Sequence, residues 1–419
     1  MFERAKNAGF RLLKYSERFT KADMVYVAKG GFWLGLGQFV TTSASFLLSL
    51  AFANLLPQEI YGLYRYVLSV VNILLITCLS GMDTAVMQAV ANGHDGALFA
   101  GMKSKMKWGV IGAVISLFIA FYYFTQGNTA LTFCFLISAV FIPFGDAFDI
   151  YNAVLNGKKE FSTYTKYNVI TQIIYVLIMV GVLFISPSLY LILFAYLASN
   201  TLLNGFFLIR TLKTHALNKS QDPETLNYGK HVSAALVLST IAAEADKLLV
   251  FHLLGAIELA IYSFAVLVTD QIKGLLKNIN TLAFPRFAQH EIDVVRKSIL
   301  SKTYTFCMIV GLLILIYILA APFLFKFFFP RYIEAVIYSQ VLAASVIAAS
   351  ASTFVYTVLE AHKKKKEIYY YNMGCNIVSL IFIFLLTATF GLMGAVIARL
   401  VSRIFAVLFA LFLVLKKSA

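Results

Sequence analysis

The segment "ANLLPQEIYGLYRYVLSVVN" at residues 53–72 recurs in weaker form as "FHLLGAIELAIYSFAVLVTD" at residues 251–270. When the Leu-Leu pairs are aligned, Tyr64 falls on Tyr262. A second pair of similar segments, "VLNGKKEF" at 154–161 and "VLEAHKKKKEI" at 358–368, lies at matching places in the two halves. Similar segments at corresponding positions indicate an internal duplication, so we expect two structurally equivalent halves.

The composition indicates that both halves lie in a membrane. The chain has 419 residues, of which 60% are hydrophobic and 13% charged, whereas soluble domains carry about 25% charged residues. The four cysteines lie in apolar segments without a CxxC motif, so we expect no disulfide or metal framework. Apolar runs of about 20 residues can cross a bilayer as helices. Such runs occur at about 30–55, 60–80, 107–125, 130–153, 167–186, 188–209, 232–254, 258–280, 303–325, 335–359, 370–389 and 391–415.

These runs predict an all-α polytopic membrane protein of twelve transmembrane helices. Six runs lie in each half, and an even number gives both halves the same orientation in the membrane. We therefore expect two parallel six-helix lobes related by a pseudo-twofold axis along the membrane normal. The predicted divisions are a basic cytoplasmic segment at 1–22, an N-lobe at 23–211, a cytoplasmic linker at 212–231 and a C-lobe at 232–419.

The lysines and arginines predict how the chain is oriented. Only Lys326 and Arg331 fall in loops opposite the N-terminus, whereas most of the 35 Lys and Arg residues lie in the N-terminal tail, the loops on its side and the C-terminus. Under the positive-inside rule both termini are then cytoplasmic. The net charge of +15 reflects this orientation and contact with lipid headgroups. Because the basic residues are scattered over short loops, they do not form a nucleic-acid-binding patch.

Several predicted spans carry polar residues at helical spacing, which indicates an aqueous cavity between the lobes. Arg65 has no acid within one turn of its own helix, so we expect it to be available to an anionic ligand. The cations expected to bind substrate in this cavity are Arg65, Lys247, Lys273, Arg399 and Arg403. Further polar residues expected on the same faces are Tyr61, Ser69, Asn72, Tyr262 and Asp270.

The stretch "TIAAEADKLLVFHLLG" at 240–255 places Glu244, Asp246 and Lys247 in the middle of the seventh span. Charges at that depth are costly and are kept for a substrate, an ion or a partner charge. Glu244 and Lys247 are three residues apart and can pair on the helix, and Asp246 lies at a depth comparable with that of Arg399. Two interpretations stay open: these groups neutralise one another, or Glu244 or Asp246 binds a coupling cation.

Further carboxylates lie in the N-lobe. Asp146 and Asp149 are one turn apart on the fourth span, so their carboxylates share a face of the helix. They either bind Na⁺ or a proton, or they anchor Lys158 or Lys159. Asp83 follows the second span, and we expect it to cap the short helix that comes next.

Three segments carry a resemblance to a known family. They are residues 35–91, with an acid before Tyr-Gly and a Gly-Met break; "ADKLLVFHLLGAIELAIYSFAVLV" at 245–268; and "LLKNINTLAFPRFAQ" at 275–289. In these segments and in its topology the chain resembles the Wzx-type polysaccharide flippases of the multidrug/oligosaccharidyl-lipid/polysaccharide exporter superfamily.

The resemblance implies a V-shaped, alternating-access transporter in the bacterial cytoplasmic membrane. Its substrate would be an undecaprenyl-diphosphate-linked oligosaccharide for O-antigen, capsule or exopolysaccharide, and its partners would include a polysaccharide polymerase and a chain-length regulator. A coupling Na⁺ or H⁺ is expected, and the acid that family members place in span seven fits Asp246. No GxxxxGK[ST] motif is present, so direct ATP use is not expected.

Two other functions stay open from the sequence. A cation-coupled multidrug exporter of the same superfamily would favour a cavity with excess acid, whereas arginine and lysine predominate on the predicted cavity faces. A membrane polysaccharide polymerase would need a large outer loop for its active site, and the longest predicted outer loop, 326–334, is short. We therefore expect a transporter and not an enzyme.

Overall fold

The computed structural model describes residues 24–215, 217–267, 269–271 and 292–416, and all regular structure within them is helical. A helical stretch without a label covers 256–267. The N-terminal half contains α2 (Met24–Leu55), α3 (Gln58–Leu74), the 3-10 turn η1 (Leu75–Cys78), α4 (Met82–Ala91), α5 (Ala97–Thr125), α6 (Thr129–Phe148), α7 (Tyr151–Gly157), α8 (Phe161–Ile185) and α9 (Leu189–Thr214). The C-terminal half contains α10 (Thr225–Leu254), α12 (Ile292–Phe328), the 3-10 turn η2 (Pro330–Tyr332), α13 (Ala335–Ala361) and α14 (Lys365–Leu415).

The helices account for the predicted membrane spans. Among the described residues, nine helices are long and apolar enough to cross a membrane. One of them, α14, is two spans, because the backbone leaves helical geometry at Gly391 (φ 58°, ψ −139°). α10 has 30 residues but carries charges in its apolar half, and a further helical stretch begins at 256, where the eighth span was predicted. The described residues thus have the expected all-α fold, and their helices match the predicted spans except for the part of the eighth span that lies outside the described residues.

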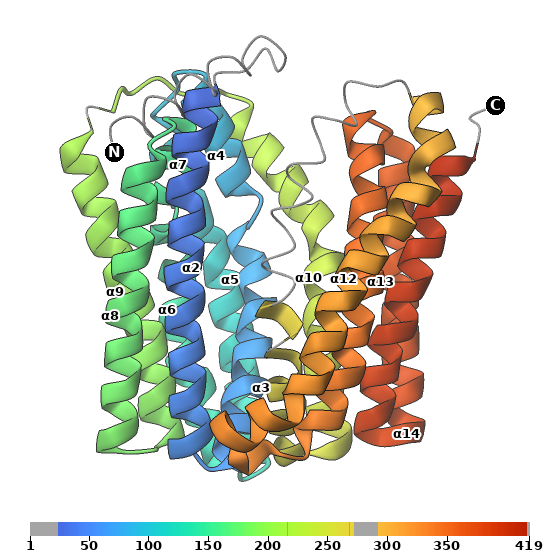
Figure 1. The fold of residues 1–419 in the computed structure, drawn as a ribbon. Helices are drawn as coiled ribbons and strands as arrows, with labels where there is room; N and C mark the ends of the chain where they lie inside the picture. Colours follow the sequence, from blue (N-terminus) through green and yellow to red (C-terminus); the bar gives the residue numbers. More distant parts are fainter. Residues whose placement is uncertain (1–23, 216, 268, 272–291, 417–419) are drawn as a thin grey trace, which may run out of the picture.

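The described helices form two lobes (Figure 1). In the N-lobe, α2 packs on α8, α5 on α6, and α6 on α9. In the C-lobe, α12 packs on α13 and α13 on α14. α10 lies between the lobes, because it packs on α14 of its own lobe and also on α3 and α4 of the other.

The lobes share a core at one end and have separate cores at the other. The shared core includes Tyr61 of α3, Phe264 and Tyr332, whose rings pack together, with 4.8 Å between the ring centroids of Tyr61 and Phe264. At the opposite end, one core around Met82 consists mainly of N-lobe residues with Leu226 of α10 packed on it, and another around Phe354 belongs to the C-lobe. Both ends of the described chain lie at this second end (Figure 1). The lobes therefore share a core at the end that carries η2 (the joined end), whereas near the termini they are connected through the packing of α10 on α4, where the Gly81 amide donates a hydrogen bond to the Ser233 hydroxyl.

The two repeated sequence segments pack against each other at the joined end. The rings of Tyr66 and Phe251 are stacked with centroids 3.8 Å apart. Any Cβ on Gly62 would collide with the backbone carbonyl of Ala256, so glycine is needed for this approach. Gly255 ends α10 with a φ of 112°, a conformation that favours glycine. The internal duplication therefore supplies both sides of the contact between the lobes.

Candidate functional site

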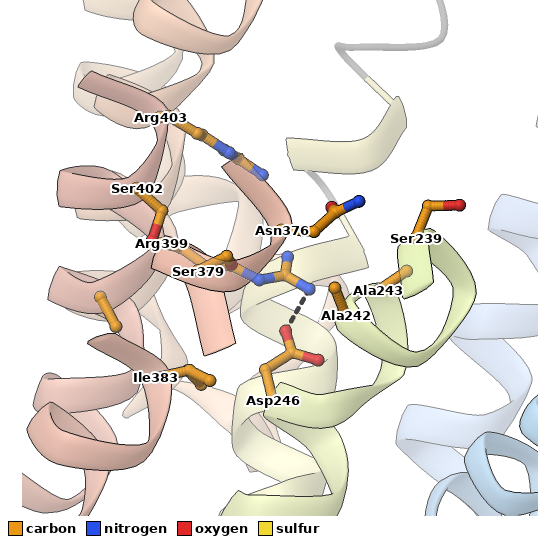
Figure 2. A pocket seen from close by; sticks show the side chains of 11 residues that line it. Ser239, Ala242, Ala243, Asp246, Asn376, Ser379, Ile383, Arg399, Ser402 and Arg403 are labelled. Atoms are coloured by element: carbon orange, nitrogen blue, oxygen red, sulfur yellow. Dashed lines mark ion pairs between the residues drawn. The ribbon is translucent and has the colours of Figure 1, made fainter. Parts of the chain in front are cut away.

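A polar pocket of about 230 Å³ lies between α10 and the two arms of α14 (Figure 2). The elements that form it are the charged part of α10 and the helical segments on either side of Gly391. Apolar residues line only part of it, including Ala242, Ala243 and Ile383. Its polar lining comprises Ser239, Asp246, Asn376, Ser379, Arg399, Ser402 and Arg403.

Asp246 and Arg399 form an ion pair inside this pocket, as the sequence predicted (Figure 2). The Tyr262 hydroxyl donates a hydrogen bond of 2.7 Å to Oδ2 of Asp246, and the Arg399 guanidinium lies 5.5 Å from the centre of the Tyr262 ring. The Asp246 side chain is only 6% exposed. Breaking such a buried pair would leave an uncompensated charge. The contacts among Asp246, Tyr262 and Arg399 therefore connect α10, the helical stretch that begins at 256, and α14.

Arg403 contributes a second guanidinium to the pocket with a different environment. It donates a short hydrogen bond to the Ser345 hydroxyl, and within the described residues it forms no ion pair with a carboxylate. A guanidinium has five N–H donors, so most of its donors remain for a ligand. The neighbouring Ser402 hydroxyl is buried without a hydrogen-bond partner and lines the same pocket. The pocket therefore offers guanidinium and hydroxyl donors, which is the chemistry of an anion site, and the nearby Asp270 offsets part of its positive charge.

A second polar group lies where α10 meets α3 of the N-lobe. Lys247 pairs with Glu244 at 2.7 Å, which confirms the pairing expected from their spacing. The Asn72 amide donates a 3.2 Å hydrogen bond to the other Glu244 oxygen and so connects the two lobes. Arg65 lies nearby on α3, close enough to Glu244 to interact electrostatically, and its Nε is buried without a hydrogen-bond partner.

The remaining residues that were predicted to line the cavity lie in different parts of the structure. Tyr61 is part of the shared aromatic core, and the Ser69 hydroxyl bonds to the Arg65 carbonyl on its own helix. Neither lines the pocket between α10 and α14. Asp270 lies near enough to Arg399 and Arg403 to interact with both electrostatically. Lys273 falls outside the described residues.

A third charged group in the N-lobe centres on Lys105 of α5, which the sequence analysis did not single out. Its ammonium lies 2.7 Å from Asp83 and 3.0 Å from Asp146, and its side chain has no exposed surface. Asp83 therefore does not cap α4: the residue at that position is Gly81, and no side chain caps the helix. Lys158 does not anchor Asp146 either, because it pairs with Asp95.

A sequence signal for Lys105 exists in the spacing of small residues. Buried residues recur about every four positions along α5, and Lys105 lies in the middle of the stripe that they form. The prediction began the third span at 107, so it placed Lys105 in a loop, whereas α5 begins at Ala97. The buried stripe comprises Ala97, Leu98, Gly101, Lys105, Gly109, Gly112, Ser116 and Ala120.

Comparisons with known proteins agree with this architecture. A family model described as polysaccharide biosynthesis protein matches residues 27–291. The fold is similar to that of a multidrug resistance MATE family transporter of the MOP superfamily in an inward-facing conformation (TM-score 0.62, 14% identity, covering 89% of this chain and 93% of that one). It is also similar to the lipid II flippase MurJ in an inward closed conformation (TM-score 0.65, 12% identity, covering 90% and 86%). No curated protein sequence matches the chain. At these identities the structural likeness establishes the fold.

Proposed function

Because the chain belongs to the polysaccharide biosynthesis protein family, we propose that it is a flippase for an undecaprenyl-diphosphate-linked oligosaccharide. It would carry this lipid from the inner to the outer leaflet of a bacterial cytoplasmic membrane for the synthesis of a surface polysaccharide. A protein with the same fold is a lipid II flippase, which supports the use of this architecture for a lipid-linked headgroup. A polysaccharide polymerase and a chain-length regulator are the partners expected for this role.

The observation that carries the proposal is the pocket between α10 and α14. A diphosphate is a strong anion, and a planar guanidinium binds phosphate oxygens through paired hydrogen bonds. Arg403 and the unpartnered Ser402 hydroxyl supply donors for such a group, whereas Asp246 holds Arg399 in place. Arg65, buried with an unpartnered Nε between the lobes, is the second cation that we assign to the substrate path.

The separate cores near the chain termini support alternating access. If both termini are cytoplasmic, as the distribution of Lys and Arg predicts, the present conformation is closed on the outer side. The substrate headgroup would then approach from the cytoplasm while its lipid tail stays in the bilayer. Rocking of the lobes would open the joined end and release the headgroup outside.

Coupling to Na⁺ or H⁺ is the remaining part of the proposal. Of the four candidate acids, Glu244, Asp246 and Asp146 are engaged by Lys247, Arg399 and Lys105 in this conformation. Lobe motion would break the contact from Asn72 to Glu244, because its two ends belong to different lobes. We therefore assign coupling to Glu244 and leave Asp246 a positioning role.

Deletion of the gene, followed by analysis of surface glycan and lipid-linked intermediates, tests this function. We expect loss of the polymer, with single lipid-linked units trapped on the cytoplasmic side. Complementation with Arg403→Gln should reduce export at least about tenfold, because a charge-assisted hydrogen bond contributes about 1.5–3 kcal/mol. Arg331→Gln, which changes an exposed arginine, is the matched control and should restore export. Unchanged glycan with altered drug tolerance would instead identify a drug exporter.

A further inference from the structure

A second pocket, of about 160 Å³, lies entirely within the N-lobe between α3, α6 and α9. No helix of the C-lobe contributes to it, so it is separate from the pocket between α10 and α14. Its lining combines carboxylates, carboxamides and an aromatic ring. The polar members are Asn72, Asp146, Asp149, Tyr196, Asn200, Thr201 and Asn204.

The charge of this pocket is opposite to that of the first. Lys105 neutralises part of the negative charge, because it pairs with Asp146 from behind the pocket wall. Asp149 accepts a 2.5 Å hydrogen bond from the Asn152 amide, and within the described residues no lysine or arginine forms an ion pair with it. The pocket therefore keeps an anionic acceptor, which would repel a diphosphate and attract hydroxyl or amino donors.

The carboxamides suit a ligand with many hydroxyl groups. Asn200 and Asn204 are one turn apart on α9, and Asn72 approaches from α3. A carboxamide both donates and accepts hydrogen bonds, as do the neighbouring hydroxyls of a sugar ring. Within the described residues, no three His, Cys, Asp or Glu side chains are placed to hold a metal ion together. A neutral polyol therefore fits the lining better than a divalent metal does.

The two pockets are close enough to share one ligand. Asn72 lines the N-lobe pocket and also hydrogen-bonds to Glu244 of α10. Ala243, which precedes Glu244 in the sequence, lines the pocket between α10 and α14. Successive helical residues point about 100° apart, so the pockets lie on neighbouring sides of one helix, whose diameter is about 10 Å. A lipid diphosphate and the first sugars attached to it can span that distance.

We propose that the N-lobe pocket is a sugar subsite, in which Asp149 and Asn200 bind hydroxyl groups of the glycan while Arg403 binds its diphosphate. This inference rests on the proposed function, since it assigns a different part of the same substrate to each lobe. The lobes then recognise chemically different groups, and a complete substrate is held across the path between them.

Binding of two defined lipids to the purified full-length protein in nanodiscs tests the subsite. The probes are undecaprenyl diphosphate and the same lipid carrying one N-acetylglucosamine. We expect wild-type protein to bind the sugar-bearing lipid about tenfold more tightly, the gain from one or two net hydrogen bonds. Asn200→Ala and Asp149→Asn should each remove most of this preference and leave the affinity for undecaprenyl diphosphate unchanged.

Ser199→Ala is the matched control, because Ser199 and Asn200 both donate to the Tyr196 carbonyl but only Asn200 lines the pocket. This variant should keep the wild-type preference, and Arg403→Gln should weaken both lipids equally. A preference that survives in both Asn200→Ala and Asp149→Asn overturns the sugar subsite and leaves the proposed function standing. Equal loss of both lipids in these two variants also overturns it. Wild-type protein that binds neither lipid overturns the proposed function, and the subsite with it.

Discussion

Lys105 shows how a charge is accommodated inside the N-lobe. Its ammonium group lies between Asp83 of α4 and Asp146 of α6, and each carboxylate comes from a different helix. A buried charge is tolerated when it is paired and hydrogen-bonded, and removal of one partner leaves the others uncompensated. Lys105 therefore joins three helices next to the N-lobe pocket and fixes the position of its Asp146 wall.

Replacement of Lys105 by methionine should destabilise the protein by about 3 kcal/mol, because Asp83 and Asp146 would lose their shared counter-charge. Lys103→Met is the control, since Lys103 is exposed on the same helix. Thermal unfolding in detergent measures both variants. If Lys105→Met unfolds at the same temperature as Lys103→Met, the three-helix ion pair contributes nothing to stability.

A double-mutant cycle tests the pair of Asp246 and Arg399. Asp246→Asn and Arg399→Gln should each lower the unfolding temperature, and the double variant should recover part of the loss, because no unpaired charge then remains buried. We expect a coupling free energy of about 1–3 kcal/mol. Strictly additive losses would mean that the two side chains do not stabilise each other, and a cation-binding role for Asp246 would then replace the structural one.

A comparison of the Asp246–Arg399 pair with Lys105 shows which site residues can be predicted from a sequence. Asp246 and Arg399 lie in clear apolar runs, so their depths can be counted and compared. Lys105 lies where the apolar run had not yet begun, and Asn200 lies with Ser199, Thr201 and Asn204 in a span whose polar residues the sequence analysis did not assign to the cavity. Their roles depend on which helices adjoin α5 and α9, and that information comes only from tertiary packing.

At the scale of helices, the repeated segments determine how the lobes meet. α3 and the helix that begins at 256 approach so closely that Gly62 contacts the backbone of Ala256. The number of spans, the Gly255 turn and the bend at Gly391 were predictable, because apolar length and glycine each have a local physical cause. The length of α5 was not, since its first turns carry lysines that only the tertiary structure buries or exposes.

Gly62→Ala should weaken the closed arrangement of the joined end, because the new methyl group would collide with the Ala256 carbonyl oxygen. We expect faster labelling of a cysteine introduced at Gln58 by a membrane-impermeant maleimide added from outside. Gly181→Ala is the control, because a Cβ there meets no atom within 4 Å. Identical labelling rates in the two backgrounds would show that this contact does not hold the lobes together.

For the whole molecule, the shared core and the two separate cores define which contacts must break during transport. Tyr61, Phe264 and Tyr332 belong to the shared core, and the Gln58 side chain also donates a 2.5 Å hydrogen bond to the Arg331 carbonyl of η2. The lobes cannot open outward unless these contacts separate. The core around Phe354 lies within the C-lobe, whereas the core around Met82 also contacts Leu226 of α10, so α10 must shift against α4 when the lobes move.

A reducible cross-link between the lobes at the joined end should therefore stop transport. In a background without the four native cysteines, Gln58→Cys with Arg331→Cys and a short bis-maleimide carrying a disulfide would connect α3 to η2. We expect glycan export to cease on cross-linking and to return when the linker is reduced. Phe133→Cys with Tyr190→Cys is the matched control, because these exposed rings lie 5.9 Å apart on α6 and α9 of one lobe. Export that continues with the Gln58–Arg331 positions fully cross-linked would rule out opening at this end, and the lobes would have to release their substrate by another route.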